Sequence, residues 1–243
     1  MKTNPHFFPY HGSPGHRLAG TGAALLAAFL LWQPGADAAV QISNLGKPVL
    51  TELGIHNAVA APMDPHSYSL AMSFTTGDTP YMLEQISITT ALYTLSENQD
   101  FLFSIYATDI SSLPTGAALV SLDHPDLSVL PTYTNTPFTP SVPFQLAANT
   151  TYSLVIEPPL TGSNLAAFQV TTTGSGYTTM QPGWSFDTAL FRVDNGAWSS
   201  LGDARLMMEV DAIMVPEPST WALLGASLGG IFLLKRRPRA GVC

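Results

Sequence analysis

The chain has 243 residues, and its 17 Asp and Glu outnumber its nine Lys and Arg to give a net charge of −8. Its one cysteine is Cys243, the last residue, so the rest of the chain has no disulfide, thiolate nucleophile or cysteine-based metal site. The acidic excess argues against nucleic acid as a partner, because two negatively charged surfaces repel each other.

The first 38 residues have the pattern of a secretory signal peptide. Arg17 precedes an uncharged apolar run from Ala23 to Trp32, and Ala36-Asp37-Ala38 has the A-x-A form of a cleavage site. We therefore expect export through the Sec translocon, removal of residues 1–38 by signal peptidase, and a mature chain that begins near Ala39.

Residues 39–214 are long enough to bury the core of one domain. Between Ala39 and Val215, three Lys and Arg stand against fifteen Asp and Glu, a net charge of −12, because most basic residues lie in the two ends of the chain. Such a surface binds an anionic polysaccharide only where divalent cations bridge the two. We expect no resident cofactor and no metal site, and keep calcium as the one candidate bridging ion.

Short runs of alternating apolar and polar residues, separated by Pro, Gly, Asn and Asp, predict β-strands through the middle of the chain. The expected strands lie at 41–45, 70–75, 86–92, 101–106, 118–122, 152–157, 166–172, 189–193 and 206–211. Asn195-Gly196 predicts a hairpin turn, and the Pro-rich stretch 131–143 predicts an edge or a crossing between sheets. This pattern predicts an all-β fold, an antiparallel β-sandwich of the jelly-roll type.

Two loops combine carboxylates with imidazoles and are the candidate catalytic positions. Asp64 and His66 lie in the first loop, and Asp123 and His124 lie in the second. As acid and base, or as metal ligands, they would suit a secreted hydrolase. As ordinary loop residues they serve turn formation, which is the interpretation we favour. Because the chain also lacks a Gly-x-Ser-x-Gly elbow and a His-Glu-x-x-His motif, we expect no catalytic residue and no enzyme.

Trp184 and Trp198 are the candidate contacts for a glycan. An indole ring can stack on a sugar, although aromatic rings more often fill the core of a sandwich. A carbohydrate-binding module that uses these two residues is therefore kept as an alternative.

Several short phrases along the middle of the chain are typical of bacterial extracellular sandwich domains. They are Ser73-Phe74-Thr75-Thr76-Gly77, Leu83-Glu84-Gln85-Ile86, Ser104-Ile105-Tyr106, Leu113-Pro114-Thr115-Gly116-Ala117-Ala118-Leu119 and Phe144-Gln145-Leu146-Ala147-Ala148-Asn149-Thr150-Thr151-Tyr152. On these phrases, residues 40–213 resemble the choice-of-anchor R domains, which occur with alternative surface-anchoring tails. The resemblance implies presentation at the cell surface and no established chemistry.

The chain from residue 215 to residue 243 reads as a separate C-terminal segment. Pro216, Glu217, Pro218 and Ser219 come first, and 14 uncharged residues follow from Trp221 to Leu234. As a helix these 14 residues extend over about 21 Å, which is short for a bilayer core of about 30 Å. We expect a single transmembrane helix whose anchoring residues are Trp221, Leu224, Leu228, Phe232 and Leu234. The basic residues Lys235, Arg236 and Arg237 then fix its end on the cytoplasmic side.

This order of motif, short apolar helix and basic cluster resembles the PEP-CTERM sorting signal of Gram-negative bacteria. The resemblance implies that Pro216, Glu217, Pro218 and Ser219 are recognised as a substrate by exosortase, a membrane-embedded protease. It also implies an inner-membrane intermediate that is cut near the motif, after which the protein reaches the cell surface or the extracellular space.

Together these features predict a non-enzymatic exported protein with a structural or adhesive role in the exopolysaccharide layer of a biofilm. Exopolysaccharide is the expected ligand, exosortase the expected processing enzyme, and nucleic acid is not expected to bind. The carbohydrate-binding module and the secreted hydrolase remain the two alternatives.

Overall fold

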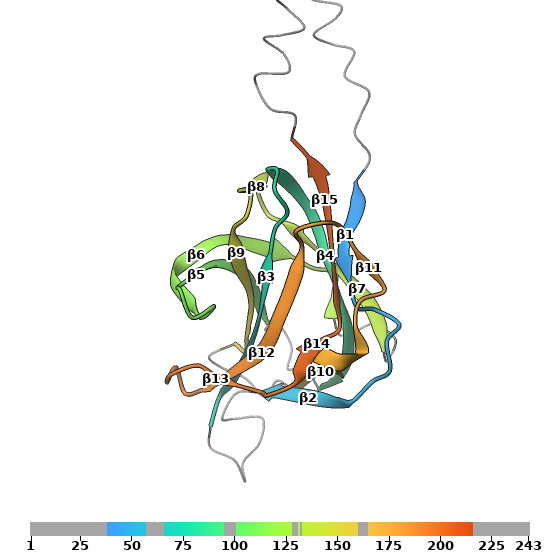
Figure 1. Ribbon diagram of the computed structural model, residues 1–243. Helices are drawn as coiled ribbons and strands as arrows, with labels where there is room; N and C mark the ends of the chain where they lie inside the picture. The colour runs from blue at the N-terminus through green and yellow to red at the C-terminus, as the bar shows by residue number, and fades with distance from the viewer. Residues whose placement is uncertain are drawn as a thin grey trace, which may run out of the picture. The chain divides into compact units, whose positions relative to one another are not determined.

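The computed structural model describes residues 38–56, 66–94, 101–127, 131, 133–159 and 165–215 (Figure 1). All of them belong to one compact unit that begins at Asp37. Within these ranges the chain forms β-strands, turns and a short 3-10 helix, η2 (Thr173–Ser175), and no α-helix. The prediction of an all-β fold is therefore confirmed, whereas residues 1–37 of the predicted signal peptide lie outside the described ranges.

The strands pair in two groups, which we call sheet A and sheet B. Sheet A contains β1 (Ala39–Ser43), β2 (Thr51–His56), β4 (Tyr81–Thr94), β7 (Thr134–Pro140), β8 (Phe144–Leu146), β10 (Leu165–Thr172), β11 (Thr179–Met180), β14 (Ala204–Leu206) and β15 (Met208–Met214). Sheet B contains β3 (Tyr68–Thr75), β5 (Leu102–Thr108), β6 (Pro114–Asp123), β9 (Thr151–Glu157), β12 (Ser185–Val193) and β13 (Ser199–Ser200). Each of the nine predicted strands overlaps one of these.

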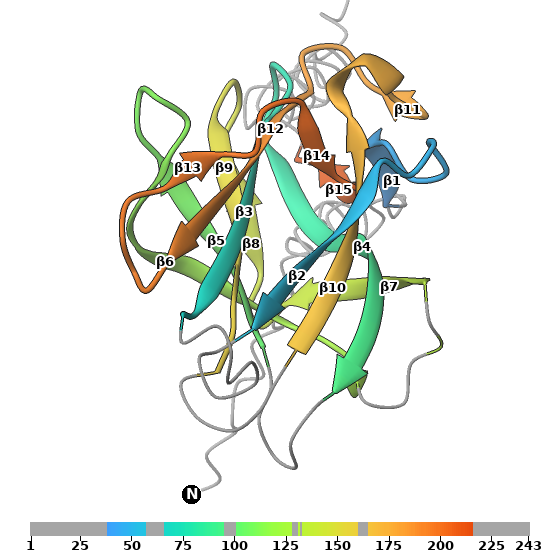
Figure 2. The same ribbon diagram turned by 90° about the horizontal axis from the view of Figure 1, so that it is seen from below.

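The two sheets are joined at one edge, so the strands form one continuous curled sheet of 15 strands. The path runs β11-β1-β15-β4-β7 through sheet A and then β6-β5-β9-β3-β12-β13 through sheet B, with every pair antiparallel. Figures 1 and 2 show how the sheet curls from β1 and β15 round to β12. The fold thus differs from the expected pair of separate sandwich sheets.

The junction between the two sheets is β7, which lies in the Pro-rich stretch predicted as an edge or a crossing. Phe138 of β7 pairs with Ile86 of β4, whereas Pro140 at the end of β7 pairs with Leu122 of β6. Proline has no N–H to donate to a ladder, so it is tolerated where pairing passes from one neighbour to the next. The predicted inter-sheet crossing is confirmed.

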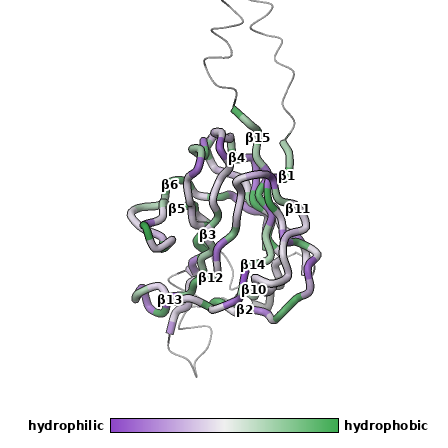
Figure 3. Tube along the Cα trace, viewed as in Figure 1, coloured by the Kyte–Doolittle hydropathy of each residue, from purple (hydrophilic) through white to green (hydrophobic). Residues whose placement is uncertain are grey.

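Aromatic residues from both sheets meet in the core. Phe103 of β5 lies 4.1 Å from Phe138 of β7 and 6.2 Å from Phe168 of β10, measured between ring centroids. All three are at most 1% exposed, so each removes a large apolar area from water. Figure 3 shows apolar and polar residues interspersed along the strands, as expected when one face of each strand packs inward.

The turn between β12 and β13 lies one residue earlier than Asn195-Gly196 predicts. Asp194 and Asn195 occupy the two central positions with φ of +49° and +58°, and the Gly196 N–H donates to the Val193 carbonyl at 2.7 Å. Two consecutive residues of positive φ closed by this bond are the requirements of a type I′ turn. Asn tolerates positive φ better than most residues, and Asp194 is held by contacts outside the hairpin that are described below.

Strand β15 is an interior strand whose start is fixed by a buried asparagine. Asn44, which follows β1, is fully buried, and its amide donates to the Leu206 carbonyl at 2.9 Å and accepts from the Met208 N–H at 2.7 Å. These two backbone groups flank Met207, where the chain passes from β14 to β15. One side chain therefore satisfies both polar groups that this break would otherwise leave buried and unpaired.

We expect Asn44→Ala to lower the free energy of unfolding by about 2 to 4 kcal/mol, because it leaves one buried carbonyl and one buried N–H without partners. Denaturant unfolding followed by intrinsic fluorescence measures the change. Asn135→Ala is the matched control, since Asn135 is exposed and its side chain accepts a hydrogen bond from Thr89, and it should lose no more than about 1 kcal/mol. Equal losses in the two variants would contradict the role given to Asn44.

Candidate functional site

The structure separates the two tryptophans that were predicted as glycan contacts. Trp184 is 2% exposed, and its ring stacks on Phe74 of β3 at 6.3 Å and meets the edge of Tyr81 of β4 at 5.1 Å. Gly77 makes room for it, since a Cβ atom there would lie 2.9 Å from the indole nitrogen. A ring enclosed in this way has no face for a sugar, so a platform built from both indoles does not fit this fold.

Trp198 lies instead in a small apolar cluster outside the main core. The cluster consists of buried Ala71, Val155 and Leu190 with partly buried Tyr106, Leu113 and Trp198 packed against them. Their neighbours along the strands that belong to the main core are Leu70 and Met72 of β3, Leu154 and Ile156 of β9, and Ala189 of β12. Because successive side chains of a strand point to opposite faces, the cluster marks the outer face of sheet B.

Arg192 links this cluster to the polar residues beside it. Its guanidinium carbon lies 4.7 Å from the centre of the Trp198 ring, and its Nη2 forms an ion pair with the Glu157 carboxylate. The side chains of the ion pair are only 20% and 24% exposed, so solvent screens their attraction less than at an open surface. Burial raises the pKa of Tyr106 above its usual 10.0, and Glu157 adds to the rise while Arg192 opposes it.

A pocket of about 380 Å³ opens next to the ion pair. Its lining consists of Ser67, Ser69, Leu102, Glu157, Pro158, Pro159, Asp194 and Asn195. Hydroxyl, carboxylate and amide groups set among apolar residues can hydrogen-bond a hydroxyl-rich ligand. Glu157 belongs both to the pocket and to the Arg192 ion pair, so the pocket and the Trp198 cluster are neighbours.

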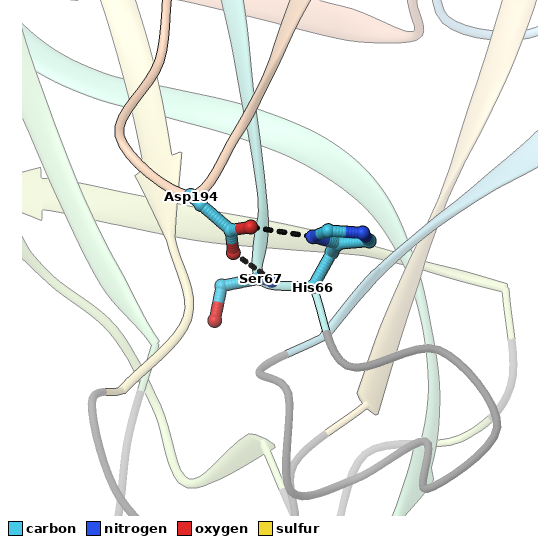
Figure 4. A network of polar contacts seen from close by, with 3 residues as sticks. All are labelled: His66, Ser67 and Asp194. Atoms are coloured by element: carbon cyan, nitrogen blue, oxygen red, sulfur yellow. Dashed lines mark hydrogen bonds and ion pairs between the residues drawn. The ribbon is translucent and has the colours of Figure 1, made fainter.

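Asp194 is held at the pocket by two contacts from the segment that precedes β3 (Figure 4). Its Oδ1 accepts the Ser67 N–H at 2.7 Å, and its Oδ2 lies 2.5 Å from His66 Nδ1. The backbone bond from Ser67 is the largest single cause that lowers the Asp194 pKa below 3.8, and the hydrogen bond and charge of His66 lower it further. In Figure 4 the Ser67 hydroxyl and the His66 ring point to opposite sides, so the three residues do not form a Ser–His–Asp relay.

His124, the other imidazole considered for hydrolase chemistry, does not join His66. His124 follows β6, its ring lies 5.3 Å from that of Phe103, and its Nδ1 lies 2.8 Å from the Pro125 carbonyl oxygen. His66 precedes β3, and the order β3-β9-β5-β6 puts about three strand spacings, or roughly 14 Å, between the two loops. Asp64 lies outside the described residues. Within the part of the chain that the structure covers, no three His, Cys, Asp or Glu side chains are grouped to hold a metal ion.

Strand β15 carries two carboxylates that the sequence reasoning did not single out. Glu209 and Asp211 alternate with core residues, and Gln85 of β4 donates its amide to Asp211 Oδ2 at 2.6 Å. Burial raises the pKa of Glu209, with Ser43 opposing the rise and Asp211 adding to it. The sequence signal that could have pointed to these two carboxylates is their placement at alternate positions of an otherwise apolar strand.

The C-terminal segment begins where the sheet ends. Met214 pairs with Tyr81, and the Val215 N–H donates to the Pro80 carbonyl at 3.0 Å. The predicted motif at Pro216, Glu217, Pro218 and Ser219, the helix from Trp221 to Leu234, and the basic residues Lys235, Arg236 and Arg237 lie outside the described residues. Among the residues that are described, no helix is long and apolar enough to span a membrane.

Comparison with known families identifies this last segment. Residues 215–237 match the family described as the PEP-CTERM protein-sorting motif. The match confirms the predicted sorting signal, and this signal implies export, a membrane-associated intermediate and processing by exosortase. No curated protein matches the chain significantly.

We expect an NMR titration to give Asp194 a pKa below 3.8 and His66→Ala to reverse only part of the shift, because the Ser67 N–H remains. The pKa of Asp194 is lower in the folded state than in the unfolded state. Asp194 therefore stabilises the fold at pH values above its unfolded-state pKa, and this contribution is lost as the pH falls through its folded-state pKa. His56→Ala is the control, since the His56 ring lies against Tyr68 instead, and should not change the Asp194 pKa. A pKa of 3.8 or higher would contradict this account.

Proposed function

We propose that this chain is a non-enzymatic protein of the bacterial cell surface or extracellular matrix, exported behind residues 1–38 and released from the inner membrane by exosortase. The observation that carries the proposal is the sorting motif that starts at Val215, the residue after the last strand. In this role the β-domain is the cargo, and Trp221–Leu234 with the basic residues after it is a transient membrane anchor.

A structural or adhesive role in exopolysaccharide is supported by the composition of the domain and by its resemblance to the choice-of-anchor R domains. A net charge of −12 between Ala39 and Val215 keeps such a domain soluble and hydrated in a polymer layer. An acidic surface can be linked to an anionic polymer by calcium, which makes the ion a condition of binding and not a resident cofactor.

We expect the mature protein from a host that has exosortase to begin near Ala39 and to lack Trp221–Leu234 in intact-mass spectrometry. Glu217→Ala should accumulate in the membrane fraction with its tail intact, because the recognised tripeptide is damaged. Glu84→Ala, the same change at an exposed position of β4, should be processed like the unaltered chain. A secreted mature form that retains Trp221–Leu234 would contradict the proposal.

A second candidate, a carbohydrate-binding module, is favoured by the neighbouring positions of Trp198 and the polar pocket. Trp198 supplies an apolar ring, and Glu157, Asp194 and Asn195 supply groups that bond sugar hydroxyls. Trp184 takes no part in this version, since it is buried. The outer face of sheet B would then be the polymer-binding surface.

We expect Trp198→Ala to weaken binding of the mature protein to purified exopolysaccharide about tenfold, since an aromatic stacking contact contributes about 1.4 kcal/mol. Calorimetric titration, run with calcium and with a chelator, measures the change and tests the bridging ion at the same time. Tyr133→Ala removes an exposed aromatic ring that precedes β7 and should leave the affinity unchanged. Unchanged affinity in Trp198→Ala would remove this candidate.

A further inference from the structure

The pocket beside the Arg192–Glu157 ion pair is lined by acids and by no cation. Among the described residues, its charged lining side chains are Glu157 and Asp194. Arg192 and His66, which contact these two carboxylates, are not among the lining residues. They hold the two acids from outside the pocket, and the pocket itself presents carboxylate oxygens to a ligand.

Both carboxylates can accept further hydrogen bonds. In the described part of the chain, Glu157 Oε1 receives the bond from Arg192, and Oε2 has no bonded partner. Asp194 accepts the Ser67 N–H at Oδ1 and has His66 Nδ1 beside Oδ2. Each carboxylate oxygen has two acceptor sites, so one site stays open on each oxygen of Asp194.

A buried hydroxyl lies at the same pocket. Ser69 is 6% exposed, and because Leu70 points into the core, the Ser69 side chain points to the outer face of sheet B, where it lines the pocket. It lies opposite Arg192 of β12, and the register that pairs Leu70 with Ile156 places it beside Glu157 of β9. Its hydroxyl has no hydrogen-bond partner among the described residues. Since buried polar groups in proteins are usually bonded, this hydroxyl is placed to bind a ligand.

These open groups require a ligand that donates hydrogen bonds and carries positive charge. An ammonium group has three N–H donors and no acceptor, which matches a lining rich in acceptors. Calcium takes about six to eight oxygen ligands, more than two carboxylates and one hydroxyl supply. In the described ranges, no three acidic, histidine or cysteine side chains are grouped for a metal ion.

The rest of the lining suits a sugar ring. Leu102, Pro158 and Pro159 supply apolar surface against which the C–H groups of a ring can pack. The volume of about 380 Å³ lies near the lower end of the range for small-ligand sites, about 300–1,000 Å³. The pocket therefore has room for a small unit of a polymer.

We propose that this pocket binds a protonated amino sugar, the repeating unit of a cationic polysaccharide. Glu157 and Asp194 bind the ammonium group, and Ser69 bonds a neighbouring hydroxyl. The inference rests on the second candidate function, because it takes the outer face of sheet B as a carbohydrate-binding surface. A domain with a net charge of −12 attracts such a polymer directly, without a bridging ion.

The test is a calorimetric titration of the full chain in a neutral detergent, with a chelator present. The two ligands are a glucosamine oligomer and its N-acetylated counterpart of equal length. At about pH 6 the amines are protonated and the carboxylates are ionised. We expect the glucosamine oligomer to bind at least about tenfold more tightly, because acetylation removes the charge that the pocket recognises.

Three variants assign the binding to the pocket. Glu157→Gln keeps the shape and removes the charge, and should weaken binding of the glucosamine oligomer about tenfold. Ser69→Ala leaves the ion pair in place and should weaken it about threefold. Glu209→Gln is the matched control, since Glu209 is also a partly buried acid but lies on β15 of sheet A, and should leave the affinity unchanged. Circular dichroism of each variant should match that of the unaltered chain.

The outcomes separate the inference from the function on which it rests. If purified exopolysaccharide binds and the glucosamine oligomer does not, or the N-acetylated oligomer binds as tightly, the carbohydrate-binding candidate stands and the cationic ligand is overturned. If no saccharide binds, both fail. Equal losses in Glu157→Gln and Glu209→Gln would show general attraction to an acidic domain and overturn the pocket. Equally tight binding of N-acetyl-lysine amide would show that an ammonium group suffices and overturn the sugar.

Discussion

The pairing of β15 on both of its sides is the constraint on which the rest of the structure depends. Antiparallel ladders to β1 and β4 fix its direction, and the Asn44 side chain fixes the break at Met207 from which it starts. Because β15 lies inside the sheet, its end cannot shift without disturbing both neighbours. The point at which the chain leaves the sheet, Val215, is therefore set by the core of the domain.

The inner and outer faces of sheet B carry different kinds of side-chain contact. Trp184 on the inside closes the core between Phe74 and Tyr81, and Trp198 on the outside covers Arg192 next to a polar pocket. The same residue type thus serves packing in one place and a surface in the other. The two carboxylates at the pocket are each held by a contact. Glu157 is paired with a cation, and Asp194 is held by a backbone N–H.

Local patterns in the sequence were sufficient for features that depend on neighbours along the chain. Alternation such as Ile86, Ile88 and Thr90 predicted strands, and the C-terminal motif is linear, so both could be read directly. The position of the turn at Asp194-Asn195 could not be predicted from the sequence, because it depends on Ser67 and His66, more than 120 residues earlier in the chain. The short strands β8, β11 and β13 offer too few residues to show a period. The separate environments of Trp184 and Trp198 depend on long-range contacts such as the approach of Gly77, which no spacing in the sequence reveals.

The attachment of the tail to an interior strand also has a mechanical consequence. A force that pulls on Val215, while the opposite end of the domain is held, acts along the axis of β15. Tension in this direction loads the ladders to β1 and β4 in shear, so that their hydrogen bonds must fail together, whereas an edge strand pulled sideways would unzip one bond at a time. The domain therefore resists a force along β15 better than a force across it.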